Sequence, residues 1–284
     1  MAIRIVTDST ADLTAPLMRE FGVEGRVHVV PLSVHFGDRE YRDGVDLDTA
    51  TFYRMLGEAR EMPRTSQPSP ADFVEVYGAV SEPGDTVISL HISSKLSGTY
   101  QSALLAARQF NDRRIEVVDT RTVSLGLGLI ALQAAKMAAE GADPDAILVR
   151  CREMMGGTLL IGLLDTLEYL HRNGRIGKAQ AMVGGLLNVK PILTIEDGVV
   201  APLDKVRGKA KGRQRLLEHA VALAPPERAY LGAIVHAQAA EEATSFREAV
   251  AARYPGCRLV VGEMGPTVGT HSGPGLVGVI LFVR

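Results

Sequence analysis

The stretch Thr86–Phe110, TVISLHISSKLSGTYQSALLAARQF, contains the junction that decides the fold. Thr86 to Leu90 is a short apolar run of the kind found in buried parallel strands. A dense group of hydroxyl side chains follows it, and Tyr100 to Phe110 has the pattern of a helix. The sequence therefore predicts a central strand that leads through a polar turn into a helix, which is the repeating unit of an α/β sheet.

The same unit recurs through the first half of the chain. Ser69-Pro70-Ala71-Asp72 marks a helix start with a capping serine, a proline and an acid in the first turn. The other predicted elements are a strand over Ile3–Val6, a helix through Leu17 and Phe21, a strand-like run over Val27–Val34, a strand over Ile115–Val118, and helices over Leu125–Ala139 and Pro144 to about Met155. Strands and helices that alternate with short links predict a doubly wound parallel sheet.

After Gly156-Gly157 the pattern changes, and we expect a mixed α+β domain over 156–284 behind an α/β domain over 1–155. Asp197-Gly198 between two apolar runs predicts a β-hairpin with a two-residue turn. The other predicted elements are a strand over Thr158–Leu163, short helices near Thr166–His171 and Ala179–Leu187, strands over Tyr230–His236 and Leu259–Met264 around a helix at Glu241–Tyr254, and a closing strand over Leu276–Val283.

Composition narrows the class of protein. A chain of 284 residues fits two domains, and 46% hydrophobic with 23% charged residues is typical of a globular protein. The formal net charge of −2 argues against nucleic-acid binding by bulk electrostatics. Two distant cysteines, a strand-like start and the lack of a spanning apolar stretch lead us to expect a cytoplasmic protein without a signal peptide.

Metal and nucleotide sites are not expected. Gly126-Leu127-Gly128 lies inside a predicted helix and lacks the third glycine of a dinucleotide fingerprint. Gly208-Lys209-Ala210-Lys211-Gly212 lacks the Walker spacing, and the metal-binding patterns HExxH and EF-hand are absent. We interpret the first segment as helix packing and the second as a surface turn.

Three polar segments are candidates for a binding site. Ser97 lies in the turn past the predicted central strand, Thr65 lies in PRTSQPSP (63–70), and His271 lies in HSGPG. Ligands of open α/β sheets bind at the carboxyl ends of strands, and the start of a helix there suits a carboxylate or phosphate. The competing interpretations are that Ser97 simply caps the helix, or that it is a hydrolase nucleophile. Its context, K-L-S-G-T, lacks the G-x-S-x-G elbow.

Two basic segments stand out in a slightly acidic chain. Cations occupy every second position from Lys205 to Arg215, so an extended backbone would place them on one side. Arg172, Arg175 and Lys178 form a second cluster in HRNGRIGK. Both segments are interpreted either as a solvated surface or as a docking site for a phosphate-bearing or acidic partner.

Taken in order, seven segments resemble the DegV family of bacterial fatty-acid-binding proteins. They are VTDSTADL, DGVDLD, TSQPSPADF, SSKLSGTYQSA, VVDTRTVSLGLG, LHRNGRIGKAQAMVGGLLNVKPIL and HSGPGLVG. The resemblance covers the whole chain. It implies an N-terminal and a C-terminal α/β domain with a long-chain fatty acid held between them, and no catalysis or cofactor.

The resemblance also implies roles for particular residues. Thr65, Ser97 and His271 match the positions that hold the fatty acid carboxylate, and Arg172, Arg175 and Arg207 match positions that contact a fatty acid kinase catalytic subunit. The expected function is to present the carboxylate for acyl-phosphate formation in phospholipid synthesis, with transient membrane contact. The alternatives are a serine hydrolase or acyl-transfer enzyme using Ser97 and His271, and a protein-interaction module whose lipid is structural. Asn173-Gly174 departs from the family's glycine pair before the arginine.

Overall fold

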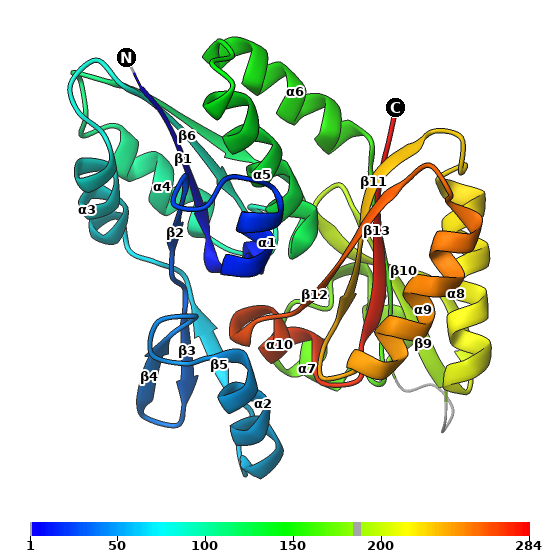
Figure 1. Ribbon diagram of the computed structural model, residues 1–284. Coiled ribbons are helices and arrows are strands. Elements are labelled where there is room, and N and C mark those ends of the chain that lie inside the picture. The colour runs from blue at the N-terminus through cyan, green and yellow to red at the C-terminus, as the bar shows by residue number, and fades with distance from the viewer. Residues whose placement is uncertain (1, 184–188) are drawn as a thin grey trace.

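The computed structural model describes residues 2–183 and 189–284. Its N-terminal half is built on a four-stranded parallel sheet (Figure 1). The strand order is β2 (Val27–Val30), β1 (Ile3–Asp8), β6 (Thr86–His91) and β7 (Arg114–Asp119). β6 lies inside the sheet with all of its residues buried, as the apolar run predicts. The predicted parallel sheet is confirmed.

Helices cover both faces of this sheet because successive strand residues point to opposite sides. Val6 and Val87 face a cluster with α3 (Pro70–Val80) and α4 (Thr99–Ala107). Their neighbours Ile5 and Ile88 belong to the core cluster on the other face. The helices of that face are α1 (Ala15–Glu20), α5 (Leu125–Ala139) and α6 (Pro144–Gly156). The sheet is therefore doubly wound.

A small antiparallel sheet extends from this half, and the sequence analysis missed it. Its strands are β4 (Arg39–Arg42), β3 (Ser33–Phe36) and β5 (Arg64–Ser66), next to helix α2 (Thr49–Glu58) (Figure 1). The single apolar run predicted over Val27–Val34 is wrong. Pro31 divides it, because proline has no N–H for a sheet ladder, and the two parts join different sheets.

The C-terminal half is a six-stranded mixed sheet, as predicted. In spatial order its strands are β10 (Val199–Arg207), β9 (Val189–Glu196), β8 (Thr158–Leu163), β13 (Val277–Val283), β11 (Ala229–His236) and β12 (Arg258–Glu263). The predicted hairpin joins β9 to β10, and Asp197 and Gly198 have φ of 49° and 80°, which suits a primed turn. Helices α8 (Lys209–Leu223) and α9 (Ala240–Arg253) cover its outer face (Figure 1).

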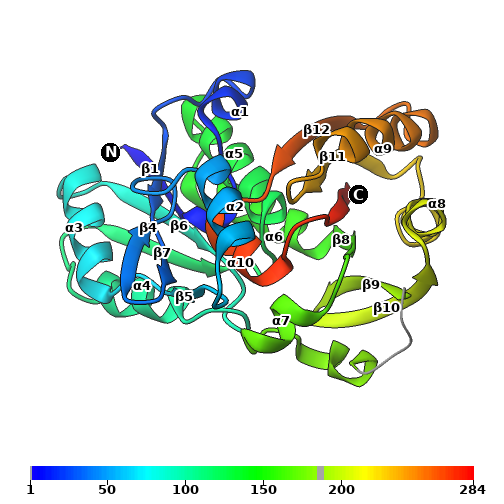
Figure 2. The ribbon, with the colours of Figure 1, turned by 90° about the horizontal axis from the view of Figure 1, so that it is seen from below.

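Four further segments are short helices. They are η1 (Ser9–Ala11), α7 (Glu168–Arg172), η2 (Gly177–Met182) and α10 (Pro266–Ser272). Seen from below, α10 lies between the two sheets (Figure 2). The helix predicted over Ala179–Leu187 begins as part of η2, a 3-10 helix, and its positions 184–188 lie outside the described residues.

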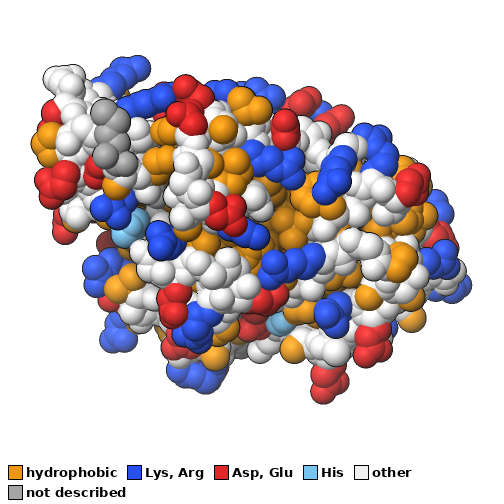
Figure 3. Space-filling view, turned by 45° about the horizontal axis from the view of Figure 1, so that its top comes forward, with side chains coloured by type: hydrophobic (Ala, Val, Ile, Leu, Met, Phe, Trp, Pro, Cys, Tyr) orange, Lys and Arg blue, Asp and Glu red, His pale blue; other side chains and the backbone are white. Residues whose placement is uncertain are grey.

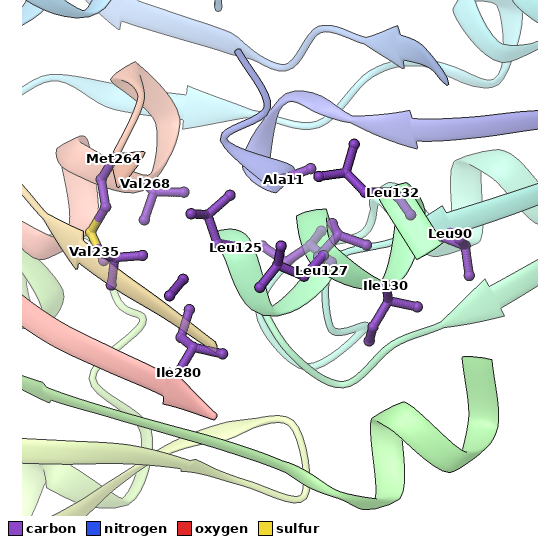
Figure 4. Close-up of a cluster of buried hydrophobic side chains, with 14 of the residues drawn as sticks. Ala11, Leu90, Leu125, Leu127, Ile130, Leu132, Val235, Met264, Val268 and Ile280 are labelled. Carbon is purple, nitrogen blue, oxygen red and sulfur yellow. The ribbon is translucent and has the colours of Figure 1, made fainter. Parts of the chain in front are cut away.

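One hydrophobic core joins the halves. Leu125 and Leu127 of α5 belong to the same buried cluster as Val235 and Ile280 of the six-stranded sheet (Figure 4). α6 ends at Gly156 and β8 begins at Thr158, close to the expected boundary at residue 155. A shared core does not by itself define two folding units, so the division into domains 1–155 and 156–284 stays a prediction. On the face in Figure 3, positive and negative side chains are interspersed around hydrophobic ones.

Candidate functional site

A cavity of about 290 Å³ lies between the inner face of the six-stranded sheet and the N-terminal half. Its sheet side is formed by residues that alternate along the strands and so share one face. These residues are Leu160, Gly162 and Leu164 from β8 and the residue after it, Leu193 and Ile195 from β9, Val235 from β11, and Leu276 and Gly278 at β13. Met264 and Val268, near α10, add to the lining (Figure 4). Most of the cavity wall is apolar.

The polar part of the wall comes from three separate segments. Thr65 lies on β5, Ser97 precedes α4, and His271 lies on α10, and all three line the same cavity. Thr65 Oγ1 and His271 Nε2 form a hydrogen bond of 2.8 Å. The structure thus brings together the three residues that the sequence singles out, although their role in holding a carboxylate stays a prediction.

His271 is neutral in this environment. Burial, followed by the positive charge of Arg175, lowers its pKa to about 4. Its Nδ1 atom is buried and has no hydrogen-bond partner among the described residues. A buried N–H without an acceptor is less tolerable than a buried lone pair. We therefore assign the proton to Nε2, so that His271 donates to Thr65 Oγ1 and the threonine hydroxyl proton is available to the cavity.

Ser97 does not cap α4 in the ordinary way. The N-cap position is Gly98, which has no side chain, and Ser97 Oγ accepts from the N–H of Thr99, the first residue of α4, at 3.3 Å and lies 2.8 Å from Thr99 Oγ1. Gly98 packs closely against the Gln67 side chain, and a Cβ at this position would lie 2.0 Å from Gln67 Oε1 and displace that amide. Gln67 also lines the cavity and donates to Ser102 Oγ at 3.2 Å. This packing fixes the loop after β6 against the loop after β5.

The hydrogen bonds that a serine hydrolase would need between Ser97 and His271 are not formed in the described residues. The Nε2 atom of His271 contacts Thr65, and the partner of Ser97 is Thr99. A nucleophilic serine needs a base within hydrogen-bond reach and a group that orients this base. In the described part of the chain, no Ser97–His271 hydrogen bond is found and no carboxylate holds His271 Nδ1.

A serine–histidine–aspartate series does exist elsewhere, inside the parallel sheet. His91 Nδ1 lies 2.9 Å from Asp8 Oδ2, and His91 Nε2 lies 2.7 Å from Ser89 Oγ. All three residues are fully buried, and Tyr77 donates to the Ser89 oxygen at 2.8 Å. The series therefore joins β1 and β6 at their carboxyl ends, where Asp8 and His91 are the last strand residues, and the complete burial of Ser89 leaves no room for a substrate at the serine.

The three arginines that the sequence groups together occupy two places. Arg172 and Arg207 line an open hollow beside α7 and β10, where Arg172 pairs with Glu168 at 2.6 Å. Arg175 instead lines the apolar cavity next to Thr65 and Ser97. Its Nε donates to Leu96 O at 3.2 Å, which ties the α7–η2 loop to the N-terminal half. The sequence missed this position because RNGRIGK shows the charge and not the direction of the loop.

The expected basic side is limited to the first part of the segment, which is extended, and the expectation is wrong for the cations beyond Arg207. The extended backbone ends at Arg207, and the chain then enters α8 at Lys209. Alternate cations on a helix point to different sides, and Arg215 pairs with Asp204 at 2.7 Å. Lys205 and Arg207 remain on the strand beside the hollow.

Asn173, where the resemblance implies a glycine, has a structural role. Its Nδ2 donates to Thr270 O at 3.1 Å, so it connects the end of α7 to α10. Gly174 keeps the backbone conformation that favours glycine, with φ of 68°. The local shape around Arg175 is therefore fixed by a side-chain hydrogen bond and one remaining glycine.

Two buried carboxyls hold the start of α10 and were missed as site residues. Asp12 Oδ1 accepts from Gly265 N at 2.9 Å, and Asp43 Oδ2 accepts from Thr267 N at 3.1 Å. Burial raises the pKa of Asp12 to about 8 and that of Asp43 to about 6. Both lie in segments, VTDSTADL and DGVDLD, that the sequence had marked. The position of His271 thus depends on the N-terminal half.

The described residues contain no group of three or more histidines, cysteines or acids placed to hold a metal ion. Within those same ranges, no helix combines the length and apolar character needed to cross a membrane.

Fold and cavity together define an α/β protein whose two halves enclose an apolar site, and the polar part of its wall combines hydroxyl and imidazole groups with the Arg175 guanidinium. A family model described as "Uncharacterised protein, DegV family" matches residues 2–284. A DegV domain-containing protein of Deinococcus radiodurans is 42% identical over 288 residues, which cover 99% of this chain and 98% of the relative. The chain belongs to the DegV family.

Solved structures support the same placement. A DegV family protein from Thermus thermophilus, described by its fatty acid binding, is 38% identical with a TM-score of 0.89, and each chain is covered completely. A stearic acid-binding protein from Eubacterium ventriosum is 26% identical with a TM-score of 0.89, covering 100% of this chain and 98% of that one. The fold predicted from the sequence is confirmed by these likenesses.

Proposed function

We propose that this protein binds one long-chain fatty acid in the cavity without chemical change and presents its carboxylate to a kinase for acyl-phosphate formation. The observation that carries the proposal is the composition of the cavity, a mostly apolar wall with Thr65, Ser97 and His271 gathered on it. The fatty-acid-binding relatives of the same fold support this ligand class.

The hydrogen-bond directions suit a carboxylate. With His271 donating to Thr65 Oγ1, the Thr65 hydroxyl proton points to a ligand rather than to the imidazole. Hydroxyl donors make charge-assisted hydrogen bonds to a carboxylate and do not occupy both of its oxygens as a bidentate arginine would. The carboxylate keeps lone pairs that can attack a phosphoryl group.

The acyl chain supplies most of the affinity in this proposal. Burying a methylene group contributes about 0.8 kcal/mol, so a long chain binds well even when the head group contributes little net energy. The alternating Leu, Ile and Val residues of the sheet face provide the apolar surface that such a chain requires. A small polar substrate would leave this surface unused.

Docking of the kinase is assigned to the open hollow with Arg172 and Arg207, which we call the docking face. Lys205 adds a third cation there, and Asp165 and Glu168 also line it. Arg175 lies at the cavity instead, where its charge faces the carboxylate end. A phosphate-bearing or acidic partner surface would complement this face.

The test compares a free fatty acid with its methyl ester on the wild type and on Thr65→Val. Losing a hydrogen bond to a charged group should weaken octadecanoate binding about 10- to 100-fold, while the methyl ester should bind equally weakly to both proteins. Displacement of a fluorescent fatty acid measures these affinities. Thr65→Ser, which keeps the hydroxyl, is the matched control and should bind within a few-fold of the wild type.

Two results would contradict the proposal. Hydrolysis of the methyl ester that disappears in Ser97→Ala would support the enzyme alternative. Equal affinity of the wild type for acid and ester would show that the carboxylate is not recognised.

A further inference from the structure

A row of residues crosses the inner face of the six-stranded sheet and contains three glycines. The register places Leu193, Gly162, Gly278, Val235 and Gly262 side by side on neighbouring strands. Glycine inside a strand weakens it and often marks close approach of a ligand or another element. The three glycines of this row differ in what occupies the space above them.

Two of the three spaces are already filled by the protein. A Cβ on Gly262 would lie 2.6 Å from Leu125 Cδ1, so a side chain of α5 occupies that position. A Cβ on Gly278 would lie 3.0 Å from Ile161 O and 3.1 Å from Val235 Cγ2. These two glycines are explained by packing within the fold.

Gly162 is different. An added Cβ would meet nothing closer than 3.8 Å, and its nearest neighbours are the δ-methyl groups of Leu164 and Leu276. Gly162 and Gly278 are directly paired, and both line the cavity. The sheet therefore has a trough above Gly162, beside Gly278, that opens to the cavity and is bordered by the methyl groups of Leu164 and Leu276.

The trough lies deeper in the sheet than the end of β8 and the start of β13, which are the strand ends nearest His271. Leu164 directly follows β8, and Leu276 directly precedes β13, close in the chain to α10 with His271. Gly162 is two residues further along β8, about 7 Å deeper. Leu160 and its partner Ile280 follow after another two residues. A chain that starts at the polar groups would reach the glycine pair after several methylenes.

We infer that Gly162 determines the length of acyl chain that this protein accepts, because the chain passes through the trough where Gly162 and Gly278 lack side chains. The inference rests on the proposed function. A side chain at position 162 would occupy the path of the distal methylenes and leave the polar groups untouched. Gly278 cannot be enlarged as freely, because its Cβ would press against backbone.

The experiment uses the full chain with Gly162→Ala and Gly162→Val, probed with octadecanoate and with decanoate, which has eight fewer methylenes. Each methylene that loses its place costs roughly fourfold in affinity. We expect Gly162→Val to bind octadecanoate about tenfold more weakly and decanoate within about threefold of the wild type, with Gly162→Ala in between. The fatty acids that co-purify should shift to shorter chains in the same order.

Gly78→Ala is the control, since Gly78 lies on α3 with open space around it, away from the cavity lining. It should leave chain-length preference unchanged. An unchanged preference in folded Gly162→Val would overturn the inference and leave the proposed function intact. Equal loss of both fatty acids would also overturn it, because position 162 would then act on the head group or the fold. A wild type that binds neither fatty acid would remove both proposals together.

Discussion

At the scale of single residues, the buried acids at the start of α10 set a pH dependence. Asp12 and Asp43 are deep in the protein, and burial is the largest cause of their raised pKa values. A raised pKa in the folded state means that the folded protein keeps a proton that the unfolded chain releases near pH 4. The stability from these groups is therefore present at low pH and is lost as pH rises through about 6 for Asp43 and about 8 for Asp12.

We expect Asp12→Asn to flatten this dependence. Between pH 6.5 and 8, wild-type stability should fall by up to about 1.4 kcal/mol per pH unit from Asp12, because one proton is lost on unfolding. The lowered pKa of His271 acts in the opposite direction, and only near the lower end of this range, where the histidine of the unfolded chain is still partly protonated. Denaturant unfolding at several pH values measures the slopes.

The exposed Asp46 is the matched control, since Arg42 holds its pKa at about 2 and Asp46→Asn removes no group that titrates near neutral pH. Identical slopes for the wild type and Asp12→Asn would show that Asp12 is already ionised in the folded protein.

The residues of the site could be predicted only in part. Thr65, Ser97 and His271 stand in distinctive segments, so both the strand–turn–helix pattern and the family resemblance lead to them. The position of Arg175 could not be predicted, because it depends on hydrogen bonds from its guanidinium to Leu96 O and Asn173 O across two loops. Likewise, glycine letters alone do not distinguish Gly162 from Gly262, since only packing shows which space is empty.

At the scale of elements, uninterrupted apolar patterns predicted the bounds of helices and strands most accurately. The predicted bounds of α5 and β8 agree with the structure, because a long apolar helix and a short apolar strand each have a clear period. The three-stranded sheet was missed because its strands have only three or four residues each and mix polar with apolar side chains. Thr65 lies on β5 of that sheet, so the sequence analysis could not predict how Thr65 is positioned at the cavity.

The two-residue spacing of the cations also gave a wrong prediction where a strand ends and a helix begins. The alternating cations from Lys205 to Arg215 cross from β10 into α8 at Gly208, whose φ of 84° favours glycine. The alternating charges continue past Gly208, but the extended backbone ends before it and a helix follows. Only the strand part of the basic segment belongs to the docking face.

At the scale of the whole molecule, the cavity and the docking face are separate surfaces. The docking face is lined by residues of α7, β10 and their neighbours, while the cavity is lined mainly by the sheet face and α10. This separation gives two independent kinds of variant. One kind should change lipid content, and the other should change only the transfer of the phosphoryl group.

We expect Arg172→Ala and Arg207→Ala to keep their bound fatty acid and to lower the rate of acyl-phosphate formation by a kinase catalytic subunit at least about tenfold, because each removes a charge from the contact. The assay follows labelled phosphate into lipid. Arg108→Ala, an exposed arginine after α4, is a control with the same change of charge. Loss of bound lipid in either docking variant would contradict the separation.

The central claim is that a fatty acid occupies the cavity, and mass spectrometry of the purified protein tests it most directly. The protein is measured first under native conditions and then after denaturation. The account predicts a mass difference equal to one long-chain fatty acid per chain, released on denaturation. A protein that has the mass of the chain alone, and still does so after incubation with long-chain fatty acids, would contradict it.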